Sequence, residues 1–194
     1  PLDLIIPTVA ILAQESQAFP THLDFPPSLL AMAIKVGDAI PSAMLQDGSP
    51  GTKVDIKDLF AGKKGVLFGV PGAYTPTCTS AHVPSFVNVT ADQWKEKGVE
   101  VVVCTAVNDA FVLSAWAATF GETSVKFLAD PCSEATKAMG LTFDAPPLLE
   151  ALGNSRCKRF VMGLDGGKVV GLNISGEDGK ADEDTYAAAA LGFF

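Results

Sequence analysis

The chain has 194 residues, of which 48% are apolar and 19% charged, so it predicts one folded domain and excludes a disordered chain. It carries 22 acidic against 14 basic side chains, and an acidic chain without a basic cluster is a poor match for nucleic acid or an anionic membrane. The four cysteines form no C-x-x-C pair and only two histidines are present. We therefore expect neither a disulfide framework nor a bound metal.

The first 32 residues differ from the rest, because they contain five prolines and no lysine or arginine. The apolar run 4–13 is interrupted by Pro7 and is too short to span a membrane, and the absence of arginine is atypical of a mitochondrial presequence. We expect residues 1–32 to form a poorly ordered extension before a domain at 33–194. The cytoplasm is the predicted default location, with a mitochondrion or another organelle as the alternative if a targeting segment precedes the chain.

From Lys35 onward the apolar pattern alternates between strand and helix signals. The turn-rich segment 47–51 between two short runs predicts a hairpin, and the continuous apolar run GVLFGV predicts a buried strand. The predicted strands cover residues 43–46, 52–56, 65–70, 99–107, 125–130, 158–165 and 168–175. The predicted helical segments cover residues 55–60, 76–97, 109–120, 133–139 and 182–191. This order predicts an α/β fold, a central mixed sheet flanked by helices with an N-terminal hairpin.

Two residues bear on the shape of these helices. Pro84 should kink the helix at 76–97, because proline has no N–H to donate to the carbonyl of Ser80. Ser133 is the expected N-cap of the helix at 133–139.

The segment from Val70 to Cys78 carries the candidate chemistry, because it joins a buried strand to the start of a helix. Thr75 suits the N-cap and Pro76 the first helical position, which puts Cys78 in the first turn. Unpaired backbone N–H groups and the helix dipole favour an anion there, so this thiol is a candidate nucleophile. The position alone leaves open that Cys78 is a small buried apolar side chain.

Pro71, Thr75 and Cys78 match the motif Pro-x-x-x-Thr-x-x-Cys of the peroxiredoxins. The runs KVGDAIPS, KKGVLFGVPGAYTPTC, VNDAFV, FLADP and CKRF resemble the type-five (type II, atypical) class, and the resemblance covers about residues 33–194. It implies the peroxiredoxin variant of the thioredoxin fold and the reduction of hydrogen peroxide, alkyl hydroperoxides and peroxynitrite. It also implies no cofactor, and a monomer or homodimer.

The resemblance implies a role for each matched residue. Cys78 would be the peroxidatic thiolate that becomes a sulfenic acid, with Thr75 and the Cys78 N–H stabilising the charge that develops on the peroxide. Pro71 would shield the thiolate from water. Arg159 matches the arginine of the family site, and Arg156 is the alternative.

Other residues near the motif are expected to shape the site. Gly72 would let the substrate approach the backbone closely. Tyr74 and Phe120 are the predicted apolar walls of the substrate pocket. His82 lies one turn after Cys78, and we expect it to support the site without contacting the substrate.

The resolving step departs from the relatives that use a C-terminal cysteine, because residues 158–194 contain none. We favour a one-cysteine cycle in which glutathione, glutaredoxin or thioredoxin attacks the sulfenic acid. Cys104, which matches a second cysteine of the family, is the candidate resolving residue in the alternative, a disulfide with Cys78.

Three other classes of protein are alternatives to a peroxidase. A thioredoxin-like dithiol reductase is excluded because Thr75 stands where the first cysteine would be. A cysteine hydrolase would need an adjacent histidine base, and His82 on the same helix is poorly directed for it. The remaining alternative is a peroxide-sensing or chaperone-like redox protein with little turnover.

Overall fold

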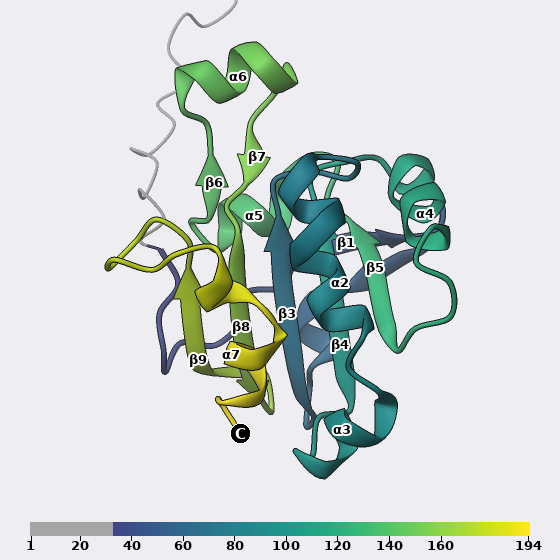
Figure 1. The fold of residues 1–194 in the computed structure, drawn as a ribbon, viewed down its shortest axis with the longest axis vertical. Helices are drawn as coiled ribbons and strands as arrows, with labels where there is room; N and C mark the ends of the chain where they lie inside the picture. The colour runs from purple at the N-terminus through teal and green to yellow at the C-terminus, as the bar shows by residue number, and fades with distance from the viewer. Residues whose placement is uncertain (1–32) are drawn as a thin grey trace, which may run out of the picture.

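The computed structural model describes residues 33–194, so the predicted extension at 1–32 lies outside the described residues. The described part is built on a seven-stranded sheet in the order β2-β1-β5-β4-β3-β8-β9 (Figure 1). These strands are β1 (Met44–Asp47), β2 (Lys53–Asp55), β3 (Lys64–Val70), β4 (Val101–Ala106), β5 (Val125–Ala129), β8 (Phe160–Asp165) and β9 (Lys168–Ile174). The helices are α1 (Ile56–Leu59), α2 (Val83–Val87), α3 (Ala91–Glu96), α4 (Ala110–Ala118), α5 (Glu134–Ala138), α6 (Pro146–Leu152) and α7 (Ala187–Leu191).

The sheet is mixed, as predicted. Strands β3, β4 and β5 run parallel in its centre, while β8 pairs antiparallel with β3, β9 with β8 and β1 with β5. The predicted hairpin is present, with Met44 opposite Asp55. The central strand β3 is apolar without interruption from Gly65 to Val70 because these residues are buried on both faces of the sheet.

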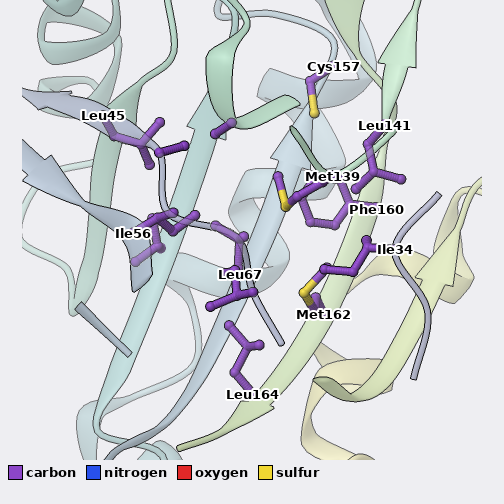
Figure 2. Packing of buried hydrophobic residues seen from close by; sticks show 14 of the residues in the cluster. Ile34, Leu45, Ile56, Leu67, Met139, Leu141, Cys157, Phe160, Met162 and Leu164 are labelled. Atoms are coloured by element: carbon purple, nitrogen blue, oxygen red, sulfur yellow. The ribbon is translucent and has the colours of Figure 1, made fainter. Parts of the chain in front are cut away.

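Each face of the sheet has its own core. One face packs against α2, α3, α4 and α7, and it includes Cys78, Cys104 and Phe86. The other packs against α1 and α5, and it includes Cys157 and Met139. Figure 2 shows Cys157 and Met139 beside Leu141 and Phe160 in this second core. The sheet therefore separates Cys157 from the face that holds Cys78.

The predicted helix at 76–97 is correct at its start and wrong in its length. The helical backbone begins at Pro76, passes through a π-helical turn, η1 (Cys78–His82), and continues as α2 to Val87. In η1 the N–H of Val83 bonds to the carbonyl of Cys78, and the wider turn comes directly before Pro84, which has no N–H to donate. A separate helix, α3, starts after Thr90. Thr90 forms a capping box with Gln93, which marks the start of a new helix and not the continuation of α2.

Other predicted helical features are corrected. Ser133 does occupy the N-cap position of α5, but it makes no side-chain capping bond and has a left-handed φ of 58°. Asp130 caps the helix instead, accepting bonds from the backbone N–H groups of Ala135 and Thr136. The predicted helix at 182–191 is divided into a 3-10 turn, η2 (Glu183–Thr185), and α7, because Tyr186 is extended.

The stretch between α5 and β8 holds structure for which no element was predicted. Strands β6 (Thr142–Phe143) and β7 (Arg156–Cys157) pair antiparallel, with α6 between them. Figure 1 shows this arm extending from one end of the molecule. Strands of two residues are too short to leave a periodic signal in the sequence.

Candidate active site

Cys78 lies at the end of the central strand, where the chain turns from β3 into a helix. The intervening loop contains Tyr74 in a left-handed conformation with φ of 61°, and the helix begins at Pro76. Cys78 therefore falls within the first helical turn, as the sequence indicated, and its side chain is only 1% exposed. The unpaired N–H groups of that turn supply partial positive charge around the thiol.

Side chains from distant segments hold the loop before Cys78. The N–H of Ala73 donates to Oδ1 of Asn108 at 3.0 Å. The Thr75 hydroxyl donates to the Gly72 carbonyl at 2.9 Å, so it does not cap the helix with its side chain. A Cβ on Gly72 would lie 3.2 Å from Nη1 of Arg156, so the glycine lets that guanidinium approach the loop.

The two candidate arginines have different surroundings. Arg156 donates from Nη1 to the Val107 carbonyl at 3.0 Å and from Nη2 to the Leu152 carbonyl at 3.1 Å. Arg159, just before β8, donates from Nη1 to Nδ1 of His82 at 3.0 Å and pairs through Nε with Asp182 at 3.2 Å. Arg159 thus contacts the turn that begins with Cys78, whereas Arg156 bonds the backbone carbonyls of Val107 and Leu152.

His82 ends the π-helical turn that Cys78 begins, and it is completely buried. Its ring lies 5.3 Å from the ring of Tyr186 and 5.4 Å from that of Phe68. Its Nε2 is 3.0 Å from the Thr185 carbonyl. Burial, together with the neighbouring charge of Arg159, lowers the pKa of His82 to about 3, so the ring is neutral near pH 7.

A cavity of about 520 Å³ opens beside these groups. It is lined by Pro71, Phe143, Lys158, Arg159, Ser175, Gly176, Glu177 and Asp182. Pro71 and Arg159 are the residues of this set that the sequence predicted. Asp182 was not predicted, because it stands in an acidic stretch typical of a solvated surface and carries no signal for a contact with Arg159.

The two predicted apolar walls do not line this cavity. Tyr74 is 55% exposed, and its ring is 6.4 Å from that of Trp116. Phe120 stacks on Phe127 and meets Trp116 edge-on at 5.3 Å. The structure gathers these rings around α4, away from the cavity that Arg159 lines.

The other three cysteines lie outside the first helical turn. All four are free, and Cys132 alone is exposed. Burial raises the pKa of Cys104 well above its usual range and raises that of Cys157 to about 12. Within residues 33–194, no group of three or more His, Cys, Asp or Glu side chains is arranged to hold a metal ion.

Comparisons with known proteins identify the family. A family model described as Redoxin matches residues 35–190. Peroxiredoxin-2C from Oryza sativa subsp. japonica is 46% identical over 145 residues, which is 73% of this chain and 87% of that protein. Peroxiredoxin-2E, chloroplastic, from Arabidopsis thaliana is 38% identical over 181 residues, covering 91% of this chain and 76% of that protein.

A solved structure agrees in fold. The crystal structure of reduced Prx3 from Vibrio vulnificus in complex with H2O2 superposes with a TM-score of 0.73 at 37% identity, covering 83% of this chain and 99% of that one. The chain belongs to the peroxiredoxin family, with the predicted thioredoxin-type fold. It is accordingly a thiol-dependent peroxidase. Within residues 33–194, no helix is long and apolar enough to cross a membrane.

Proposed function

We propose that Cys78 is the peroxidatic residue and that Arg159, Thr75 and Pro71 form the rest of the reacting site. The observation that carries this proposal is the shared helical turn: Cys78 begins it, and His82 at its end contacts Arg159 at 3.0 Å. A thiolate at a helix N-terminus beside a guanidinium is stabilised by both. Arg159 also lines the cavity together with Pro71, from which a peroxide would approach.

In the proposed reaction the Cys78 thiolate attacks the terminal oxygen of a hydroperoxide. The S–O bond forms as the O–O bond breaks, so sulfur is oxidised to a sulfenic acid and the peroxide is reduced. The leaving oxygen takes a proton and departs as water or an alcohol. Because the Thr75 proton is donated to the Gly72 carbonyl, its oxygen keeps lone pairs for the O–H of the peroxide. The Cys78 N–H and Arg159 then stabilise the charge on the departing oxygen.

Hydrogen peroxide, alkyl hydroperoxides and peroxynitrite are the proposed substrates. Hydrogen peroxide has direct support from the relative that was crystallised with H2O2. The cavity of about 520 Å³ is larger than hydrogen peroxide needs, which supports a place for organic hydroperoxides.

An external thiol is proposed to complete the cycle. It attacks the sulfenic sulfur, releases water and forms a mixed disulfide, which a second thiol of glutathione, glutaredoxin or thioredoxin then reduces. Cys104 is fully buried in β4, and burial raises the pKa of its thiol, which argues against it as the attacking thiolate. The four free cysteines support a reducing compartment such as the cytoplasm, while one relative is chloroplastic.

The direct test is a steady-state peroxidase assay with thioredoxin and glutaredoxin systems in parallel. We expect turnover of hydrogen peroxide with at least one system and its loss in Cys78→Ser. Retention of activity by Cys78→Ser would refute the assignment. Mass spectrometry after one equivalent of peroxide tests the cycle, because a Cys78–Cys104 disulfide would refute the one-cysteine version.

A further inference from the structure

The guanidinium of Arg159 is held from two sides by partners of different charge. On the inner side Nη1 donates to the neutral ring of His82 at 3.0 Å. On the outer side Nε pairs with Asp182 at 3.2 Å, and that carboxylate is 40% exposed and also accepts a hydrogen bond from Ser175. The Arg159 side chain is only 9% exposed, so turning it away would cost both contacts at once.

The partners of His82 allow only one form of its ring. The Thr185 carbonyl can only accept a hydrogen bond, so Nε2 must carry the proton. The guanidinium can only donate, so Nδ1 must present its lone pair. Both requirements are met by the same neutral tautomer, and a protonated ring would lose the bond to Arg159. The charged groups that act on the ring are Arg159 and Asp182, and the titratable Tyr186 stacks on it.

A neutral acceptor has an electrostatic advantage at this place. A carboxylate on the inner side would also orient Arg159, but it would cancel the positive charge next to the thiolate. The imidazole supplies direction without a negative charge. The negative partner, Asp182, is at the cavity and is screened by water because it is partly exposed. The charge of Arg159 is thus offset only by a partly exposed carboxylate, while the partner on its inner side is neutral.

The C-terminal segment from Thr185 onward holds the His82 ring in place. The Thr185 carbonyl orients His82, and Tyr186 stacks on its ring. The segment is itself attached to the reactive helix, because the N–H of Ala187 donates to the Ser85 hydroxyl at 3.1 Å. It is also anchored by Phe193, whose ring lies so close over Gly171 that a Cβ there would come within 2.2 Å of it.

We propose that His82 is a positioning residue, a neutral imidazole oriented by the Thr185 carbonyl that holds the guanidinium of Arg159 toward Cys78 without cancelling its charge. This inference rests on the proposed roles of Cys78 and Arg159. It makes the segment around Thr185 a determinant of the reactivity of Cys78, although that segment contacts no substrate.

The test compares two replacements of His82, one that removes the hydrogen-bond acceptor for Arg159 and one that removes the packing of the ring. His82→Phe fills the space between the neighbouring rings but offers no acceptor to Arg159. His82→Asn packs worse but keeps an acceptor oxygen near the position of Nδ1. We expect the rates of Cys78 alkylation at pH 6 and of reaction with peroxide to fall by about 10- to 100-fold in His82→Phe, with the pH profile of alkylation displaced upward, because the guanidinium is no longer held in place. His82→Asn should keep most of the wild-type rate.

A matched control separates positioning from packing. Phe86 is buried and packs its ring 5.6 Å from that of His82, so Phe86→Leu should lower the melting temperature and leave the alkylation profile unchanged. If His82 only fills space, the order of the rates is reversed: His82→Phe keeps the wild-type rate and His82→Asn loses it. Wild-type rates in a folded His82→Phe, or equal losses in both variants, would overturn the proposal.

A measurement on the unmodified protein keeps the proposal open to refutation if a variant does not fold. Nitrogen NMR of the His82 ring should find Nε2 protonated and Nδ1 unprotonated from pH 5 to 8. A proton on Nδ1 would overturn the inference. Alkylation and NMR need no peroxide, so they test His82 separately from the peroxidase assay, whose failure would refute the proposed function instead.

Discussion

Cys78 and Cys104 belong to the same core and are buried to the same extent, at 1% and 0% exposure, yet they occupy different electrostatic environments. Cys104 is inside β4, which pairs with β3 on one side and β5 on the other, and burial raises the pKa of the thiol. Cys78 is in the first turn of a helix, where the N–H groups are unpaired, and His82 at the end of the same turn contacts Arg159 at 3.0 Å.

If Cys78 is the peroxidatic residue, as proposed, burial by itself does not decide whether a cysteine reacts. At Cys104 burial raises the pKa of the thiol. The proposed difference at Cys78 is fixed positive charge, which the backbone N–H groups of the first helical turn and the guanidinium of Arg159 would supply.

The largest effect should come from replacing the two cysteines in turn. Cys78→Ser should lower the rate of peroxide reduction by more than about 1000-fold, because a hydroxyl at this position is not ionised near pH 7. Cys104→Ala is the matched control, and its rate with an external thiol should be close to that of the wild type. Stopped-flow measurement of peroxide consumption gives both values. A comparable loss in Cys104→Ala would show that the sheet cysteine takes part in turnover.

The next effect concerns the guanidinium. Arg159→Lys keeps the charge but replaces Nη1 and Nε, which bond His82 and Asp182, by a single nitrogen, so we expect the second-order rate constant with hydrogen peroxide to fall by about 100-fold. Arg156→Lys is the control, because Arg156 bonds the carbonyls of Val107 and Leu152. Arg156→Lys should lower the melting temperature and leave the rate constant with hydrogen peroxide close to that of the wild type. The assignment of Arg159 would be wrong if the two variants lost activity equally.

The strand and the helix start that position Cys78 could be predicted from the local sequence. The apolar run of β3 and the sequence Thr75-Pro76 at the start of the helix depend on neighbouring residues, and both lie where the pattern put them. The split of the helix at Thr90 was also a local signal, the capping box with Gln93, which the apolar spacing across 76–97 obscured.

The surroundings of Arg159 could not be predicted in this way. Asp182 and Thr185 reach the site only because the C-terminal segment folds back across β8 and β9, with Phe193 seated over Gly171. Contacts between segments so far apart depend on tertiary packing, which leaves no spacing rule in the sequence. For the same reason Phe120, which was expected at the substrate pocket, lies instead in the aromatic cluster beside α4.

The buried imidazole of His82 should make the stability of the protein depend on pH. The pKa of His82 is about 3 in the folded protein and near 6.5 when exposed, so the unfolded chain takes up a proton first as the pH falls. The stability that neutral His82 provides is therefore complete above pH 6.5 and is lost between pH 6.5 and 3, at a rate of at most about 1.4 kcal/mol per pH unit. Urea unfolding of the wild type and His82→Phe at several pH values isolates this contribution. Parallel pH curves for the two proteins would contradict it.

The smallest effect is on stability at the cysteines that have no proposed catalytic role. Cys104→Ser places a hydroxyl in a fully buried apolar site, which should lower the free energy of unfolding by about 1–3 kcal/mol. Cys132→Ser makes the same chemical change on the exposed surface and should stay within about 0.5 kcal/mol of the wild type. Urea denaturation under reducing conditions measures both. Equal stabilities would mean that the interior around β4 accommodates a polar group, and the contrast with the Cys78 turn would then rest on the N–H groups and Arg159 alone.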